Sequence, residues 1–146
     1  MPNKTIHILL VEDNEGDILL VKDAFEEAKI IIDLSVVTNG QSALDFLRKK
    51  GPYQNAHAVD LVLLDVNLPI LDGHEVLKQA KSDPQLRAIP VVMLTTSSSP
   101  KDIERARAND VNSYITKPLN VNEFLKVVIE ACNFWIEIIS IRTIKS

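Results

Sequence analysis

The chain has 146 residues and a mass of 16.3 kDa, a size that suits one domain built around one hydrophobic core. Apolar residues make up 46% of it and charged residues 25%, which excludes a disordered or low-complexity chain. The net charge of −4 disfavours binding to the negatively charged phosphate backbone of nucleic acid, so nucleic acid is not an expected direct partner.

The cysteine content and the hydropathy pattern predict a cytoplasmic protein. Cys132 is the single cysteine, so it cannot form an internal disulfide, and no Cys/His cluster has the spacing of a zinc site. The first apolar run is too short for a signal peptide, and charges interrupt every later run before it could span a bilayer. We therefore expect no membrane association.

Five short apolar runs predict β-strands along the chain: Ile6 to Val11, Ile32 to Val37, Leu61 to Leu64, Val91 to Leu94 and Asn112 to Ile115. Most lack the polar alternation of a half-exposed strand, so they should be buried on both faces. The segments between them have helical spacing, and such alternation forces parallel pairing because each helix carries the chain back before the next strand. The sequence thus predicts a doubly wound α/β sandwich, a single domain over residues 1–146.

Acidic side chains follow two of these strands. Glu12 and Asp13 come after the first and Asp65 after the third, at the strand ends where α/β folds bind ligands. Taken singly, each is more often a solvated turn residue than a ligand. Three carboxylates that meet would repel one another unless a cation lay between them, and Mg²⁺ is the hard ion that prefers such ligands.

Two further strand ends add an anion-binding hydroxyl and ammonium. Thr95 follows the fourth strand and Lys117 the fifth, where Pro118 restricts the lysine backbone. Alone, Lys117 would be interpreted as a surface lysine. Carboxylates, a cation, an ammonium and a hydroxyl together suit phosphoryl transfer, in which positioning and charge stabilisation dominate.

These segments, each at a predicted strand end, resemble the receiver domain of a two-component response regulator: Leu9 to Asn14, Leu64 to Pro69 with Asp72-Gly73, Met93 to Thr95, and Tyr114 to Pro118. The resemblance covers nearly the whole chain. It implies a flavodoxin-like (βα)5 fold, a parallel sheet in the order 2-1-3-4-5, a long C-terminal helix and no output domain. It also implies a signalling domain that accepts a phosphoryl group, rather than an enzyme.

The resemblance assigns roles to the strand-end residues. Asp65 would be the phosphoacceptor for a histidine kinase, and Glu12 and Asp13 would hold Mg²⁺ with Asp65 and the backbone carbonyl of Asn67. Lys117 would pair with Asp65 and then with a phosphoryl oxygen, while the Thr95 hydroxyl would donate to another. Phosphorylation adds about 1.5 to 2 negative charges, which these groups are placed to neutralise.

Signal output would follow from the same resemblance. Movement of Thr95 toward the phosphoryl group would let Tyr114 rotate inward, changing the surface of the fourth helix, fifth strand and fifth helix. Asp110 stands before the fifth strand where such domains often have glycine. Aspartate tolerates a left-handed backbone better than most residues, so we expect the turn to survive.

The last helix, capped by Asn120, carries more apolar surface than one core needs. Its apolar arc is roughly 220°, about twice the ~100° of an ordinary amphipathic helix. We expect a stripe including Phe124 and Phe134 on one side and a second stripe facing a partner, which predicts a homodimer through these residues: Leu125, Ile129, Cys132, Ile136 and Ile139. Burial of the extra residues within the chain is the alternative.

This helix, the opening Val11 to Asp17 and the long loop at Gly51 to Val59 resemble stand-alone regulators paired with cyanobacterial phytochromes. That resemblance implies a light-sensing histidine kinase as partner. Two other functions remain open. A haloacid dehalogenase type phosphohydrolase also uses an aspartate nucleophile but generally needs a second aspartate where Asn67 stands, and an interaction module independent of phosphate would not need the intact acid, threonine and lysine set.

Overall fold

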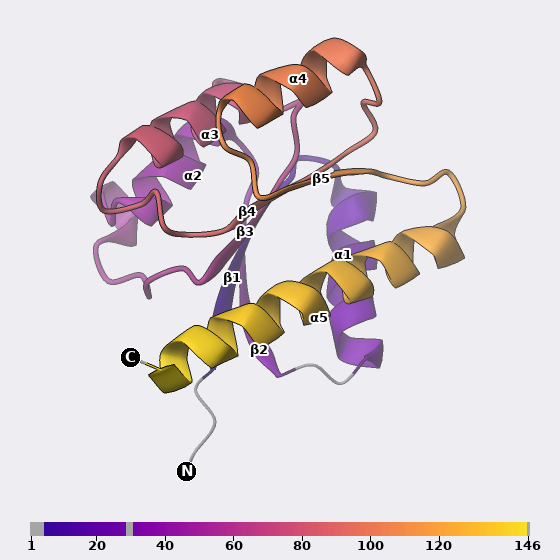
Figure 1. The fold of residues 1–146 in the computed structure, drawn as a ribbon, viewed down its shortest axis with the longest axis horizontal. Helices are drawn as coiled ribbons and strands as arrows, with labels where there is room; N and C mark the ends of the chain where they lie inside the picture. Colours follow the sequence, from indigo (N-terminus) through magenta and orange to yellow (C-terminus); the bar gives the residue numbers. More distant parts are fainter. Residues whose placement is uncertain (1–4, 29–30, 146) are drawn as a thin grey trace.

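The structure, a computed structural model, describes residues 5–28 and 31–145, with side chains described up to residue 140. Strands and helices alternate along the chain, with one short 3-10 helix (η1) before β3 (Figure 1). Their bounds are β1 Ile6–Val11, α1 Glu15–Glu27, β2 Ile32–Val37, α2 Gly40–Leu47, η1 Gly51–Tyr53, β3 Leu61–Leu64, α3 Gly73–Ser82, β4 Val91–Thr95, α4 Pro100–Ala108, β5 Ser113–Thr116 and α5 Val121–Lys145.

The five strands form one parallel sheet in the order β2-β1-β3-β4-β5, as predicted. The chain moves outward from β1 to β2 and then crosses to β3, so the strand order reverses between β1 and β3. In the register, Val11 at the end of β1 lies beside Leu64 at the end of β3. The first three strands have the predicted bounds, β4 extends one residue further to Thr95, and β5 is shifted by one residue.

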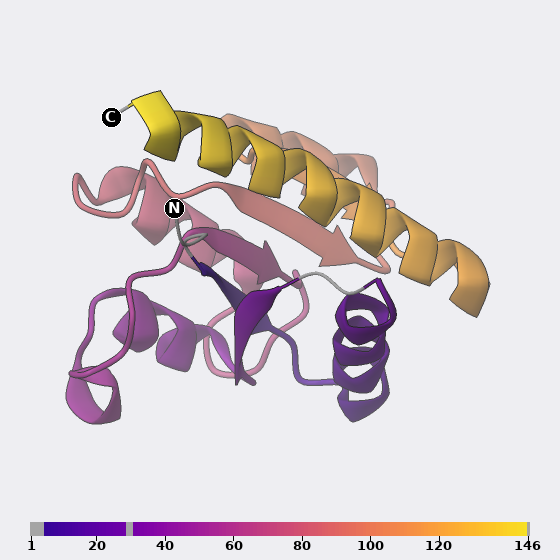
Figure 2. The same ribbon diagram turned by 90° about the horizontal axis from the view of Figure 1, so that it is seen from below.

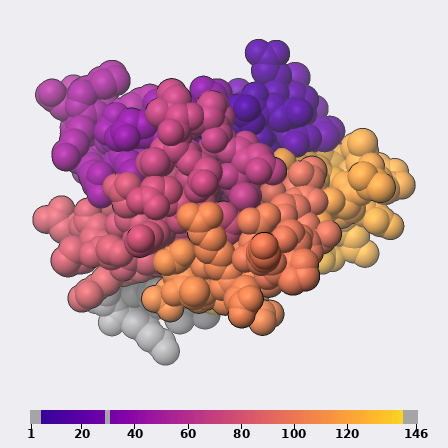
Figure 3. Space-filling model, turned by 90° about the horizontal axis from the view of Figure 1, so that it is seen from above, coloured from indigo at the N-terminus to yellow at the C-terminus, as the bar shows by residue number. Residues whose placement is uncertain are grey.

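Helices cover both faces of the sheet (Figures 1 and 2). Alternate residues of β1 point to opposite faces, so Leu9 and Val11 pack with α2, α3 and α4, whereas Ile8 and Leu10 pack with α1 and α5. In the space-filling view, α2, α3 and α4 form a continuous layer over one face (Figure 3). This double cover explains why the inner strands are almost entirely apolar.

Short polar side chains begin four of the helices. Asn14, Asn39, Asp72 and Asn120 each accept a hydrogen bond from the backbone N–H three residues ahead, at donor to acceptor distances of 2.8–3.1 Å. The predicted cap at Asn120 is therefore confirmed. Because α1 begins four residues after the last residue of β1, the Asn14 cap fixes where the residues between this strand and this helix lie.

The packing of α5 corrects part of the sequence interpretation. Its buried residues come from the first predicted stripe (Phe124), from the second (Cys132 and Ile139) and from outside both (Val128 and Trp135). Cys132 and Ile139 were predicted for the dimer face, but they lie in the core because the 3.6-residue period places the buried seam between the two stripes. Leu125, Ile129 and Ile136 are partly exposed beside that seam, and Phe134 is exposed.

Two smaller features of the chain also bear on the sequence interpretation. Asp110 has a φ of 62°, which confirms that this turn requires a left-handed backbone and that aspartate accepts it.

Within the described residues, no helix combines the length and apolar character needed to cross a bilayer.

Candidate functional site

The predicted acidic residues meet at the carboxyl ends of β1 and β3. The backbone N–H of Asp65 donates to the carbonyl of Val11 at 3.1 Å, which places the residue after β3 directly beside the residues after β1. One carboxylate oxygen each from Glu12, Asp13 and Asp65 lies within 4.8 Å of the others. Glu12 and Asp65 are buried, whereas Asp13 is exposed.

This cluster is electrostatically unfavourable without a cation. Burial, reinforced by the nearby charge of Asp65 and opposed by Lys117, raises the pKa of Glu12 from 4.5 to about 7. A divalent ion with oxygen ligands would relieve both the desolvation and the repulsion. The donor set therefore fits Mg²⁺ or a similar hard cation, with Asp13 on the solvent side.

Lys117 enters this cluster from the end of β5. Its Nζ donates to Glu12 Oε1 and, at 2.8 Å, to Asp17 Oδ2, while Asp65 Oδ2 is 3.8 Å away. Burial by itself would lower the pKa of Lys117, but the hydrogen bonds to Asp17 and Glu12 and the charge of Asp65 hold it above its ordinary value. The ammonium therefore stays charged at the site.

The two oxygens of Asp65 differ in their surroundings. Oδ1 accepts the backbone N–H of Val66 at 2.7 Å, and Oδ2 faces the Lys117 ammonium. The loop beyond is tight, because the N–H of Gly73 donates to the carbonyl of Val66 at 2.8 Å. One acceptor oxygen is thus fixed by the backbone while the other lies on the side of the cationic groups.

Thr95 and Tyr114 are both linked to Ser97, in the loop that leaves β4. Thr95 is fully buried, its Oγ1 accepts the Ser97 N–H at 3.2 Å, and its carbonyl accepts the Lys117 N–H at 2.6 Å. The Tyr114 hydroxyl donates to the Ser97 carbonyl at 2.8 Å. The structure thus brings Thr95 close to Lys117 through the backbone and to Tyr114 through one loop residue.

A second polar cluster was not found by sequence reasoning. The buried His74 of α3 donates through Nε2 to Asp102 Oδ1 of α4 at 2.9 Å, and the Ser97 hydroxyl donates to the other carboxylate oxygen. The hydrogen bonds from Ser97 and His74 lower the pKa of Asp102. This cluster ties α3, α4 and the loop after β4 together, and the spacing of its members in the sequence gave no signal for it.

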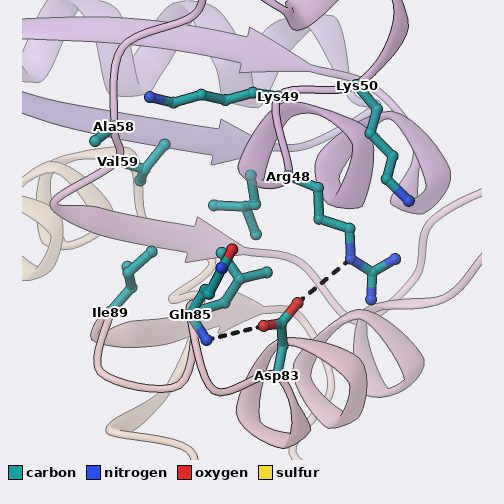
Figure 4. Close-up of a pocket in the computed structure, with 10 residues that line it drawn as sticks. Arg48, Lys49, Lys50, Ala58, Val59, Asp83, Gln85 and Ile89 are labelled. Atoms are coloured by element: carbon teal, nitrogen blue, oxygen red, sulfur yellow. Dashed lines mark hydrogen bonds and ion pairs between the residues drawn. The ribbon is translucent and has the colours of Figure 1, made fainter.

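A separate pocket lies away from this site. A pocket of about 470 Å³ is lined by Arg48, Lys49 and Lys50 after α2 and by residues before β3 and β4, at the edge where the strands begin (Figure 4). Arg48 turns toward Asp83 there, with 3.7 Å between Nε and Oδ2. The acidic cluster lies at the opposite edge of the sheet, where the strands end.

Comparison with known proteins identifies the family of the chain. Residues 8–129 match the family described as the response regulator receiver domain. The chain belongs to this receiver family. It is 40% identical over 134 residues to response regulator Rcp1 of Synechocystis sp., covering 92% of this chain and 91% of Rcp1.

Solved receiver structures show the same fold. The crystal structure of the phosphorylated cyanobacterial phytochrome response regulator RcpA is 42% identical, covers 91% of this chain and 95% of RcpA, and has a TM-score of 0.88. The Mn²⁺-bound form of Rcp1 is 40% identical, covers 89% of this chain and 94% of that one, and has a TM-score of 0.85. This chain is therefore a receiver related to phytochrome response regulators.

Proposed function

We propose that this receiver accepts a phosphoryl group on Asp65 from the phosphohistidine of a histidine kinase. The meeting of Glu12, Asp13 and Asp65 with the Lys117 ammonium beside them is the observation that carries the proposal. That RcpA has been crystallised phosphorylated and Rcp1 with Mn²⁺ supports it. Mg²⁺ is the cation that we propose for this chain, held by the three carboxylates and the backbone carbonyl of Asn67.

The site residues account for the transfer step. A carboxylate oxygen of Asp65 attacks the phosphorus, the O–P bond forms, and the N–P bond breaks with its electron pair going to the kinase imidazole. A cation held by Glu12, Asp13 and Asp65 would neutralise charge on the transferring oxygens. Lys117 and the Thr95 hydroxyl then hold the new phosphoryl oxygens, and Glu12 keeps a buried negative charge on the metal side.

Output would follow from the contacts around Ser97. If the Thr95 hydroxyl turns to the phosphoryl group, its hydrogen bond with the Ser97 N–H is lost, and the Ser97 carbonyl that holds the Tyr114 hydroxyl is free to move. Tyr114 then rotates inward and changes the surface formed by α4, β5 and α5. The phosphoryl group thereby favours one of two packings through contacts that it makes in only one of them.

The kinase must cover the edge of the sheet where Asp65 lies. Four exposed apolar side chains come from segments at that edge: Leu19 in α1, Ile70 after β3, and Leu119 and Val121 after β5. A phosphohistidine that reaches Asp65 brings its own protein surface against these side chains, which would bury them. A phytochrome histidine kinase is the donor that the similarity to RcpA favours.

A response regulator needs a surface for its partners, and we propose a homodimer through α5. Leu125, Ile129 and Ile136 remain partly exposed next to the buried seam of this helix, and the exposed Phe134 packs edge-on against Trp135. Cys132 and Ile139 support the interface from within the core instead of touching a partner.

Phosphotransfer from purified histidine kinases tests the proposal. A radiolabelled kinase with Mg²⁺ should transfer its label to the wild-type chain within minutes and fail to label Asp65→Asn, and a chelator should abolish transfer. An equally labelled Asp65→Asn chain would overturn the acceptor assignment. Release of inorganic phosphate from small phosphomonoesters at steady turnover would instead favour the dehalogenase-type phosphohydrolase.

A further inference from the structure

Asp17 is an acidic residue at the site that the proposed chemistry leaves without a role. It lies outside the three-carboxylate cluster, yet its Oδ2 is 2.8 Å from the Lys117 Nζ, compared with 3.8 Å for Asp65 Oδ2. Lys117 is nearly buried. Its ammonium is therefore shared among three carboxylates, of which two belong to the metal cluster and Asp17 does not.

The local fold holds Asp17 in place for this contact. It lies in the first turn of α1, where its backbone N–H donates to the capping Asn14 side chain at 2.9 Å. A carboxylate in the first turn is also favoured by the helix dipole. The side chain is 27% exposed, so Asp17 lies at the rim of the site, whereas Glu12 is buried.

Cation binding changes what Lys117 can pair with. A divalent ion held by Glu12 and Asp65 would compete with the ammonium for these two carboxylates, and a buried ammonium that loses its carboxylate without replacement is strongly destabilised. Asp17 offers a partner that the cation does not need. Lys117 can then release Glu12 to the metal and still remain beside Asp65.

We propose, on the basis of the proposed function, that Asp17 is a positioning residue. It holds the Lys117 ammonium in place when Glu12 exchanges its contact with Lys117 for a contact with the cation. Without Asp17, Lys117 has Glu12 and Asp65 as its carboxylate partners among the described contacts, so cation and ammonium compete for the same oxygens. Loss of Asp17 therefore weakens metal binding in two ways. It removes one negative charge near the ion, and it leaves Lys117 to compete with the ion for Glu12 and Asp65.

A double-mutant cycle in Mg²⁺ affinity separates the two effects. Isothermal titration calorimetry with Mg²⁺ alone is performed on wild type, Asp17→Asn, Lys117→Met and the double variant. We expect Asp17→Asn to weaken Mg²⁺ binding about fivefold more in the wild-type background than in the Lys117→Met background, where the competing ammonium is absent. The direct electrostatic effect of Asp17 on the ion is present in both backgrounds and cancels.

Glu15→Gln is the matched control, because Glu15 is exposed and carries the same charge in the same helical turn. It should show no coupling with Lys117→Met. Asp17→Glu, which keeps the charge, should restore part of the affinity, and this variant also covers the case in which Asp17→Asn fails to fold.

The outcomes distinguish this inference from the function on which it rests. Equal effects of Asp17→Asn in both backgrounds would overturn the anchoring role while leaving the metal site intact. If wild type itself binds no Mg²⁺, the proposed phosphoacceptor site fails. A coupling that matches the expected size, restored in part by Asp17→Glu, supports the anchor.

Discussion

Replacing Gly73 with alanine should destabilise the fold and disturb the acceptor at the same time. A Cβ at this position would lie 2.0 Å from the carbonyl oxygen of Asp65 and 2.9 Å from both the Asp65 carbonyl carbon and the Val66 Cα. All three are backbone atoms, and the shortest contact falls about 1.4 Å short of the 3.4 Å of an ordinary contact. The start of α3 and the end of β3 must therefore move apart.

The expected cost follows from this displacement. Overpacking of this kind costs about 3 kcal/mol, and the better helix propensity of alanine returns up to about 1 kcal/mol. We therefore expect the free energy of unfolding to fall by about 2 kcal/mol. Because the displaced backbone belongs to Asp65, Mg²⁺ affinity should fall as well, although no ligand has been removed.

Urea unfolding followed by circular dichroism measures the first effect, and calorimetric titration with Mg²⁺ measures the second. Gly16→Ala is the control, since its Cβ would approach no strand backbone and would meet the capping side-chain oxygen of Asn14 at 3.2 Å, so the stability should change by less than about 1 kcal/mol. A Gly73→Ala chain within about 0.5 kcal/mol of wild type would refute the close approach between α3 and the acceptor strand.

Three further predictions follow from single features. The pKa of Glu12 is raised from 4.5 to about 7, so the folded chain retains a proton that the unfolded chain loses, and the free energy of unfolding should fall as the pH rises from about 5 to 7. Mg²⁺ must displace the same proton. The Mg²⁺ affinity of the wild-type chain should therefore drop about tenfold from pH 8 to pH 6, whereas that of Glu12→Gln should not. Ile70 is exposed and has a φ of 70°, so Ile70→Gly should raise the free energy of unfolding of the chain by about 1 kcal/mol. A lower free energy of unfolding in urea would contradict the strained backbone. Ile136→Glu should shift the sedimentation equilibrium toward monomer, and an unchanged mass at matched concentration would remove the α5 interface.

The strands and the acidic cluster could be predicted because topology determines both. Continuous apolar runs identify buried parallel strands, and in a parallel sheet every strand ends at the same edge. Glu12 and Asp65 therefore had to lie near one another once β1 and β3 were neighbours. Helix N-caps such as Asn120 could also be predicted, because capping depends only on residues within one helical turn.

The sequence could not predict which of several possible partners a side chain contacts in the folded chain. The residue spacing of α5 defined a wide apolar arc, but the orientation of the helix on the sheet selected Cys132 and Ile139 for the core. Lys117 was expected to pair with Asp65, yet its long side chain reaches Glu12 and Asp17 more closely. The pair of His74 and Asp102 joins two helices across the fold, and nothing local in the sequence announces it.

The location of the labile phosphoryl group tests the central claim most directly. After treatment with acetyl phosphate and Mg²⁺, borohydride reduces an acyl phosphate on aspartate to homoserine, and tandem mass spectrometry of the digested chain identifies the position. The account predicts homoserine at position 65, with Asp13 unmodified and no product when Mg²⁺ is chelated. Homoserine at another acidic position, or a product that forms equally well without the cation, would contradict it.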